Sequence, residues 1–257
     1  MNVAYAAGSE GISIHLSAPV LGHFFGIPVT STLIMVWTTI ALLAVFLMYM
    51  RPRLKLVPGK MQIAIEAIVG GAFDYMAQAL ESRTLAQKFF PLIMSIFIFI
   101  LALNWIGLIP GVTSIGIYGE SHGNSTLIPF WYPANTDLNI TIALALIAFF
   151  AIEIAGIAAL GLWKYGGKFI NFSSPLNFLI GIIELFSELA RLVSFSFRLF
   201  GNIFAGKTLL VIAIFFVPYI LPVPLLAFEL FVGLIQAFIF AVLTLFFIKL
   251  AIAEPEH

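Results

Sequence analysis

Residues 175–217 have the sequence PLNFLIGIIELFSELARLVSFSFRLFGNIFAGKTLLVIAIFFV, which is apolar over most of its length. Pro175 suits the first turn of a helix and the next proline is Pro218, so the pattern predicts one helix across the whole segment. Such a helix would be on the order of 65 Å long, about twice the ~30 Å hydrocarbon core of a bilayer. The sequence therefore predicts a helix that either breaks or crosses a membrane at a steep tilt.

The composition of the whole chain predicts a membrane protein. Of its 257 residues, 62% are hydrophobic and 9% are charged, about a third of the charged fraction of an ordinary soluble domain. That is too little charge to cover a water-facing exterior, so we predict an all-α integral membrane protein with about five membrane-crossing helices. The formal net charge of zero gives no reason to expect a nucleic-acid partner. The absence of cysteine excludes disulfides and thiolate metal sites.

The remaining segments complete a single membrane domain over residues 1–257. Crossing helices are predicted at residues 30–50, 88–109, 138–163, 175–217 and 225–253, the last two forming a long, strongly tilted hairpin. In residues 60–80, polar residues such as Glu66 and Asp74 interrupt apolar ones at helical spacing, which predicts an amphipathic helix in the membrane interface. Residues 111–136 are rich in Gly, Ser, Pro and Asn and predict a surface loop.

The basic residues predict the orientation of the chain in the membrane. Eight of them fall in segments that five crossings place on one side: Arg51, Arg53, Lys55, Lys60, Arg83, Lys88, Lys164 and Lys168. The N-terminal arm, the 111–136 loop and the 218–224 turn contain no Lys or Arg. Because basic residues concentrate in cytoplasmic loops, we expect the N-terminus outside and the C-terminus in the cytoplasm. No secretory leader or transit peptide is expected.

Polar residues gather on the last two predicted helices. Glu184, Arg191 and Arg198 recur every seven residues and share one helical face, with Glu188 and Asn202 four residues from the first and the last of them. The facing helix carries a similar stripe: Glu229, Gln236 and Thr244. A charge at mid-bilayer costs roughly 2.5–3.5 kcal/mol, so such residues are functional candidates. Glu188 and Arg191 alternatively neutralise each other, whereas Arg198 has no acid three or four residues away and needs a partner from elsewhere.

Two motifs on these helices are specific. Residues 198–206, RLFGNIFAG, resemble the RLFGN-x-x-AG signature of the a subunit of F-type ATP synthases. Residues 236–240, QAFIF, match the second hallmark of that family. Further matches are residues 56–60 (LVPGK), 104–110 (NWIGLIP) and 137–139 (DLN). The resemblance covers essentially the whole chain, in order.

The resemblance implies the role of a stator in a rotary motor. In this family the a subunit holds two offset aqueous half-channels against a rotating ring of c subunits, and Arg198 matches the essential arginine. A guanidinium group stays protonated at physiological pH, so it would attract an ionised ring carboxylate and block a proton shortcut between the half-channels. The implied partners are the c-subunit ring, the peripheral-stalk b subunits, the remainder of the F1Fo complex and the lipid bilayer.

The resemblance also implies an ion pathway along both helices. Gln236 aligns with a glutamine near the essential arginine, and Asn202 aligns with the polar residue one turn beyond it. Glu184 aligns with an acidic residue assigned to the half-channels, and its alternative is an ordinary interface carboxylate. Lys207 and Glu229 depart from the family, whose members usually place a Glu and a His there. They form either a buried ion pair or an outer-side relay in which Glu229 passes protons inward and Lys207 tunes its acidity.

Two further acidic residues are candidates for the pathway. Glu153 lies about 16 Å along its helix from Lys164, hence near mid-depth, and either lines a half-channel or pairs with a cation on the long helix. Asp137 either marks a channel mouth or is an ordinary solvated loop residue. The sequence shows no phosphate loop, nucleophile motif or metal cluster. We therefore expect ATP chemistry in other subunits, and no cofactor or metal in this chain.

Two other function classes compete with this interpretation. A self-sufficient secondary transporter would commonly show internal repeats and broken helices in two corresponding halves, and neither is visible. A non-conducting membrane scaffold would leave Arg198 and Gln236 unexplained. We therefore expect a non-catalytic subunit that conducts a coupling ion, H+ with Na+ as the alternative, in a bacterial plasma membrane, with the mitochondrial inner membrane as the alternative location.

Overall fold

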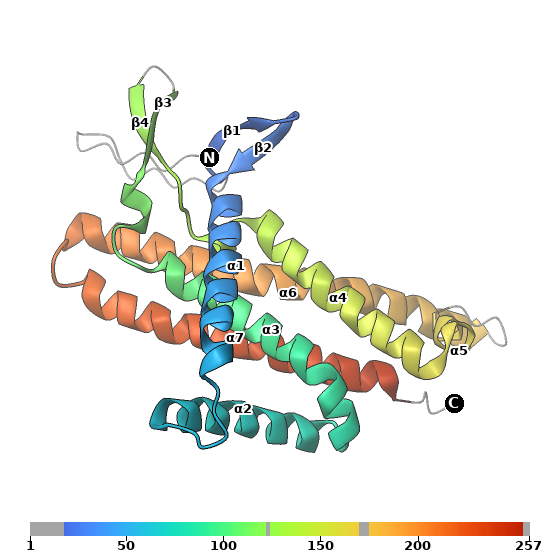
Figure 1. Ribbon diagram of the computed structural model, residues 1–257. Helices are drawn as coiled ribbons and strands as arrows, with labels where there is room; N and C mark the ends of the chain where they lie inside the picture. Colours follow the sequence, from blue (N-terminus) through green and yellow to red (C-terminus); the bar gives the residue numbers. More distant parts are fainter. Residues whose placement is uncertain (1–17, 122–123, 170–174, 254–257) are drawn as a thin grey trace. The chain divides into compact units, whose positions relative to one another are not determined.

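The computed structural model describes residues 18–121, 124–169 and 175–253, and most of them are helical (Figure 1). Five described helices are long and apolar enough to cross a membrane: α1 (Ser31–Met50), α3 (Arg83–Gly107), α4 (Leu138–Leu160), α6 (Pro175–Phe216) and α7 (Pro222–Ile252). The predicted all-α membrane fold with five crossing helices is confirmed. Both chain ends, for which the sequence predicts opposite sides of the membrane, lie outside the described residues.

Two shorter helices accompany the five long ones. The 20-residue helix α2 (Lys60–Ala79) carries charged residues along its length and is not among the candidate spans. It coincides with the segment predicted to lie in the membrane interface, and that placement stays a prediction. The six-residue helix α5 (Leu162–Gly167) follows α4 directly. Three short 3₁₀ helices occur in connecting segments: η1 (Arg51–Arg53), η2 (Val112–Ser114) and η3 (Ala134–Thr136).

Two antiparallel hairpins interrupt the helical pattern. One pairs β1 (Val20–Phe24) with β2 (Ile27–Thr30), and the other pairs β3 (Gly116–Ser121) with β4 (Asn124–Pro129). The second hairpin lies inside residues 111–136, which the sequence predicts as a loop. Glycine is required where this hairpin begins, because a Cβ atom at Gly116 would overlap the backbone of Ile128 on the partner strand. The abundance of Gly, Ser and Asn in this segment hid its strand pattern.

The contacts between Cα atoms divide the chain into two compact units. The first unit contains Met1–Tyr49, Ile98–Thr141 and Phe197–Phe238. The second contains Met50–Phe97, Ile142–Ser196 and Ile239–His257. Four of the long helices are divided between the units: α3, α4, α6 and α7 each contribute one segment to the first unit and one to the second.

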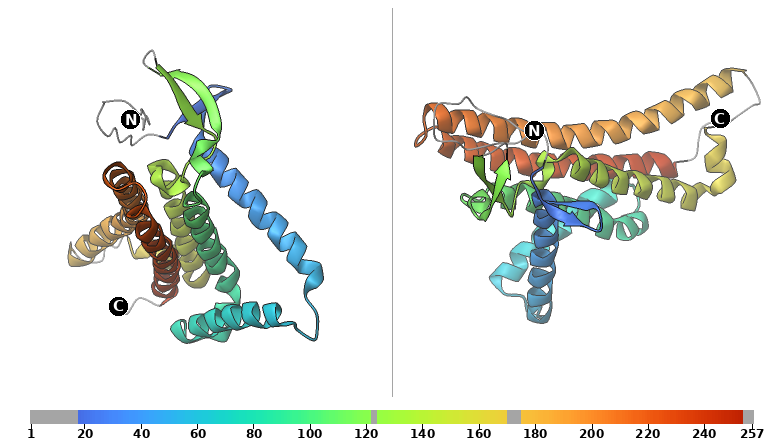
Figure 2. Two further views of the ribbon diagram at one scale, coloured as in Figure 1. Left: turned by 90° about the vertical axis from the view of Figure 1, so that its left-hand side faces the viewer. Right: turned by 90° about the horizontal axis from the view of Figure 1, so that it is seen from above.

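In the first unit, the later part of α6 and the earlier part of α7 lie side by side (Figures 1 and 2). Two side chains of α3 hold the backbone of α7. Asn104 donates a hydrogen bond to the carbonyl oxygen of Gly233 at 2.9 Å, and Trp105 donates one to that of Leu230 at 3.1 Å. A Cβ atom at Gly233 would lie only 3.1 Å from the Cβ atom of Asn104. Glycine therefore allows α3 and α7 to approach closely, as small residues do between membrane helices.

In the second unit, apolar side chains from five helices form one core. Its buried members come from α2, α3, α4, α5 and α7, and include Met76, Phe89, Ile152, Tyr165 and Leu245. Small residues let these helices pack closely, since a Cβ atom at Gly156 would overlap the ring of Tyr165. This packing fixes the Tyr165 ring against α4 and leaves its hydroxyl group to find a polar partner.

Helix α6 is a single uninterrupted helix of 42 residues. Of the two sequence-based alternatives, the break does not occur between Pro175 and Phe216. At 1.5 Å per residue the helix is about 63 Å long. Helix α7 begins at Pro222 rather than at the predicted residue 225. Proline fits the first helical turn, where the backbone N–H has no partner within the helix.

Candidate functional site

The residues of the RLFGN and QAFIF motifs meet between α6 and α7 in the first unit. Asn202 donates a hydrogen bond through Nδ2 to Oε1 of Gln236 at 2.6 Å. Gln236 is almost completely buried, and its Nε2 atom has no hydrogen-bond partner among the described residues. Arg198 is partly buried on α6, one helical turn before Asn202, and so belongs to the same face. The structure thus brings Asn202 and Gln236 together, with Arg198 adjacent along the helix.

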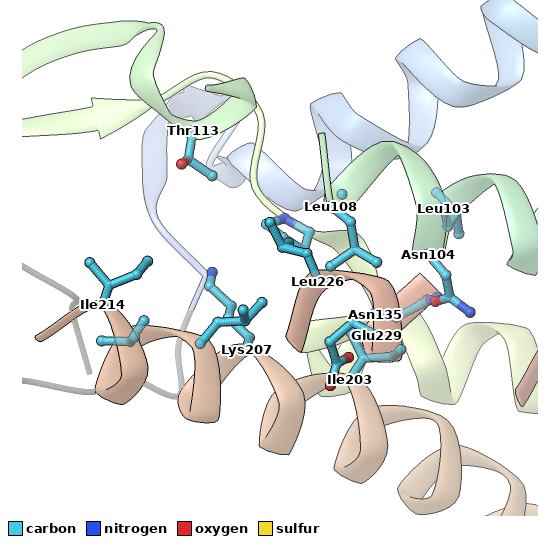
Figure 3. A pocket seen from close by; sticks show the side chains of 14 residues that line it. Leu103, Asn104, Leu108, Thr113, Asn135, Ile203, Lys207, Ile214, Leu226 and Glu229 are labelled. Atoms are coloured by element: carbon cyan, nitrogen blue, oxygen red, sulfur yellow. The ribbon is translucent and has the colours of Figure 1, made fainter. Parts of the chain in front are cut away.

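A cavity of about 130 Å³ lies in the first unit and is lined by α3, α6, α7 and the segments around η2 and η3 (Figure 3). Most of its lining is apolar. The polar exceptions are Asn104, Thr113, Asn135, Lys207 and Glu229. In Figure 3 Lys207 lies apart from Asn104 and Asn135, across the cavity. A cavity of this size with several polar groups can hold water.

Two asparagines connect the lining of this cavity. Asn135 donates through Nδ2 to Oδ1 of Asn104 at 2.7 Å, and Asn104 donates in turn to the backbone of α7. The Oδ1 atom of Asn135 is buried without a hydrogen-bond partner among the described residues. The sequence noted Asn104 only as part of a matching stretch and did not single out Asn135. Asn104 could have been recognised from the sequence as a candidate, because a polar amide inside an apolar span is costly to bury.

Lys207 and Glu229 both line the cavity, but they form no ion pair in the described chain. The Nζ atom of Lys207 is buried and lies 3.0 Å from the ring centroid of Tyr132, a cation–π contact. Glu229 is 4% exposed, and its carboxyl group packs against Gly206, where any Cβ atom would overlap it. Of the two alternatives for this pair, the direct ion pair is absent.

Asp137 is buried rather than solvated. Its Oδ2 atom accepts a hydrogen bond from the hydroxyl group of Thr32 on α1 at 2.8 Å. Its Oδ1 atom accepts from the backbone N–H of Asn139 at 3.0 Å, which caps the first turn of α4. Asp137 therefore links α1 to the N-terminus of α4, and the prediction of an ordinary solvated loop residue is wrong.

A second group of charges lies in the second unit. Lys168, which follows α5, contacts Oε1 of Glu184 at 2.5 Å and Oε1 of Glu188 at 3.6 Å. Arg191 donates to Oε2 of Glu188 at 2.7 Å, and its guanidinium lies 3.9 Å from the ring centroid of Phe247. Glu188 is 3% exposed, so this pairing satisfies a buried carboxylate. Glu184 is paired as well, which the sequence did not predict.

Glu153 joins this group through an aromatic residue. The hydroxyl group of Tyr165 donates to Oε2 of Glu153 at 3.0 Å, while Oε1 of Glu153 is buried without a hydrogen-bond partner among the described residues. Burial, followed by the charge of Glu153, raises the pKa of the Tyr165 hydroxyl far above its ordinary value of 10. Tyr165 therefore remains a neutral hydrogen-bond donor. The sequence did not single it out, because an aromatic residue after an apolar helix is ordinarily packing.

The family pattern described as ATP synthase A chain matches residues 33–249 of this sequence. The chain belongs to this family. The match includes both motifs and every residue that the sequence predicts for the ion pathway. Membership makes the chain a membrane component of an ATP synthase that takes part in ion transport, and it displaces the transporter and scaffold alternatives.

Members of the family from distant bacteria show the same relationship. The ATP synthase subunit a of Campylobacter curvus is 34% identical over 205 residues, which cover 80% of this chain and 83% of that protein. That of Mycobacterium tuberculosis is 39% identical over 207 residues, covering 78% of each chain. That of Geotalea daltonii is 33% identical over 221 residues, covering 85% of this chain and 86% of that protein.

Proposed function

We propose that the chain is the stator half of the ion path in a rotary ATP synthase, loading and unloading H+ on the carboxylates of a c-subunit ring. Arg198 supports this role most directly. It is a cation on a membrane-spanning helix, one turn from the hydrogen-bonded amides of the exposed Asn202 and the buried Gln236. An arginine within a bilayer is costly unless it meets an anion, and a ring carboxylate is such an anion.

The chemistry of Arg198 accounts for the coupling of ion flow to rotation. Its guanidinium cannot be deprotonated at physiological pH, so a ring carboxylic acid that approaches it releases its proton and pairs as the carboxylate. A carboxylate that leaves the arginine binds a new proton before it enters lipid, because an ion is far less soluble there than the neutral acid. Protons entering one side and leaving the other therefore move only when the ring turns.

The cavity in the first unit supports an outer half-channel. Glu229 would receive protons there, Lys207 would tune its acidity, and Asp137 would lie near the entrance. Asn104 and Asn135 offer amide groups between the loop and α7 that can bind water. Lys207 acts without direct ion pairing, through its charge across the cavity and its contact with Tyr132.

The carboxylates of the second unit support an inner half-channel. Glu184 and Glu153 would line it. Along α6, Glu184 precedes Arg198 by about 21 Å and Lys207 follows Arg198 by about 14 Å, at 1.5 Å per residue. The two groups of pathway residues thus occupy different depths of one helix, on either side of the arginine in sequence. That separation suits two half-channels that do not connect directly.

The length of α6 supports a tilted hairpin against a ring. An unbroken helix of about 63 Å fits within the ~45 Å of a bilayer with its headgroups only at about 45° or more to the normal. Ordinary spanning helices tilt by about 20°, so an additional surface must stabilise this arrangement. The c-ring would supply that surface, and peripheral-stalk b subunits would hold the stator. The expected setting is a bacterial plasma membrane with the C-terminus in the cytoplasm.

ATP-driven acidification of inverted membrane vesicles tests this function. Arg198→Ala is expected to abolish acidification while the complex still assembles, as judged by immunoblot. Arg83→Ala is the matched control, because the Arg83 side chain is 76% exposed and pairs only with the exposed Asp74 among the described salt bridges. The control is expected to pump normally. An assembled Arg198→Ala complex that pumps at the wild-type rate would refute the proposal.

A further inference from the structure

Helix α5 and Lys168, the residue that follows it, have no part in the pathway described so far, yet their side chains contact three carboxylates. It follows α4 after Gly161, whose backbone angle φ of +81° permits the change of direction (Figure 1). Tyr165 reaches back to Glu153 on α4, and Lys168 reaches Glu184 and Glu188 on α6. Helix α5 and the residue that follows it thus contact all three acidic side chains of this group.

Carboxylates outnumber cations in this group. Three carboxylates, Glu153, Glu184 and Glu188, share two cations. Lys168 contacts Glu184 and Glu188, and Arg191 contacts Glu188. Among the described residues Glu153 forms no ion pair: Oε2 accepts a hydrogen bond from the neutral Tyr165 hydroxyl group, and Oε1 is buried without a hydrogen-bond partner. Lys168 acts on Glu153 only through its more distant charge. An ionised Glu153 therefore carries a charge that is only weakly offset, because Lys168 is already shared by Glu184 and Glu188.

A proton on Glu153 would remove this imbalance. The carboxyl groups of Glu153 and Glu188 lie close enough to interact. A hydrogen bond between two carboxyl groups requires that one of them carry a proton. Protonated at Oε1, Glu153 would donate to Glu188 and still accept from Tyr165 at Oε2, so both of its oxygens would be satisfied. The Tyr165 ring, fixed in the space that Gly156 leaves open, holds the carboxyl group in this orientation.

We propose that Glu153 is a binding site for an exchangeable proton on the inner side of the ion path, and that Tyr165 is the residue that positions it. The proposal rests on the proposed function. In each exchange the O–H bond at Oε1 of Glu153 breaks, the proton passes to water or to the Glu188 carboxylate, and the reverse step restores it. The Tyr165 O–H bond stays intact throughout.

Few titratable or charged side chains of the described residues face Glu153. From α5 the groups that face Glu153 are Tyr165 and Lys168, and from α6 they are Glu188 and, through it, Arg191 and Glu184. Helices α2, α3 and α7 contribute apolar side chains to the core next to it, such as Phe89, Ile93 and Leu245. A pH effect at Glu153 therefore has a short list of sources, which substitution can separate.

The first test compares Glu153→Gln with Glu66→Gln in the intact complex. Glutamine has the shape and hydrogen-bonding pattern of the protonated acid but cannot release a proton, so folding is expected to persist. The proposal expects ATP-driven acidification of inverted vesicles by Glu153→Gln to fall on the order of 10²-fold, the lower range for a positioned proton-transfer group. Glu66 lies exposed on α2, and its change is expected to have no effect. Glu153→Asp keeps a carboxyl group and is expected to restore part of the rate.

The second test compares Tyr165→Phe with Tyr75→Phe, a tyrosine that is 49% exposed on α2. Phenylalanine keeps the ring in place and removes only the hydroxyl group. Because the ionised form of Glu153 loses its donor, the pH of half-maximal acidification is expected to move upward by about one unit. A purely structural role for Tyr165 would lower the amount of complex and leave this pH unchanged.

The outcomes separate this proposal from the proposed function. Normal pumping by Glu153→Gln, with loss of pumping by Arg198→Ala, overturns the role of Glu153 and leaves the stator function in place. Normal pumping by both variants overturns both. If Glu153→Gln reduces assembly, the Glu153→Asp complex decides the question through its pH profile, because the shorter side chain moves the carboxyl group away from Tyr165. A wild-type profile for that variant overturns the proposal.

Discussion

Replacing Gly206 by alanine is expected to disrupt the packing of α6 on α7. Gly206 is the last residue of the motif at 198–206, and an added Cβ atom would overlap the carboxyl group of Glu229. Glu229 is 4% exposed, so its side chain has little room to move away. The substitution therefore acts on the same carboxylate that the proposed outer half-channel uses.

The loss of unfolding free energy in Gly206→Ala can be worked out by comparison with Gly201→Ala on the same helix. A Cβ atom at Gly201 meets nothing within 4 Å, so that change should only add the helix propensity of alanine, about 0.5–1 kcal/mol. Gly206→Ala gains the same propensity and adds overpacking, which costs about 1–3 kcal/mol in a well-packed site. The propensity cancels between the two variants. Their difference in unfolding free energy is therefore expected to be about 1–3 kcal/mol.

Thermal unfolding of the purified complex, followed by the loss of helical circular dichroism, measures this difference. Gly206→Ala is expected to unfold several degrees below Gly201→Ala, on the order of 2–4 °C per kcal/mol for a chain of this size. Adding Glu229→Asp, which withdraws the carboxyl group by one methylene, should recover part of the loss. Equal unfolding temperatures for the two alanine variants would refute the packing argument. Failure of Glu229→Asp to recover any stability would show that the overlap involves another group.

Three other contacts yield predictions. Asn104→Leu leaves the amide of Asn135 without its acceptor and should cost about 1–3 kcal/mol, measured as a lower unfolding temperature. Thr32→Val removes the donor to Asp137 at almost constant volume and should cost about 1–3 kcal/mol, measured in the same way. The hydrogen bond from Lys249, and its charge, lower the pKa of Glu81 below its ordinary value of 4.5. The stability that this pair contributes is therefore complete above pH 4.5 and is lost as the pH falls through the lower, folded-state pKa. Unfolding temperatures of wild type and Glu81→Gln should differ slightly at neutral pH and converge in acid.

The helices could be predicted because they depend on local pattern. Long apolar runs give five spanning helices regardless of how they pack. Pro175 occupies the first helical turn that was predicted for it, whereas α7 begins at Pro222, three residues before its predicted start. Asn202 and Gln236 were each singled out from the two motifs, but the hydrogen bond that joins them was not predicted.

The remaining contacts could not be predicted because they join residues distant in sequence. The partner of Tyr165 depends on the direction in which α5 leaves Gly161, which composition does not encode. The partner of Lys207 is the ring of Tyr132, in a loop whose path is set by tertiary contacts. The direct ion pair between Lys207 and Glu229 was a reasonable alternative from charge alone, but charge fixes neither the direction of a side chain nor the shape of a cavity.

The two units use their charged groups differently, and this difference bears on function. In the second unit Lys168 and Arg191 each contact a carboxylate directly, so removing either cation would expose a buried negative charge and destabilise the fold. In the first unit Lys207 and Glu229 line a common cavity without pairing, so neither is held by a direct ion pair with the other. A direct ion pair resists any change in the charge of either partner. A group that must gain and lose a proton repeatedly is therefore better placed without such a pair, as Lys207 and Glu229 are, than within one. By the same reasoning Glu153, the one carboxylate of its group that the described salt bridges leave without a cation, is the member of the second unit best suited to exchange a proton.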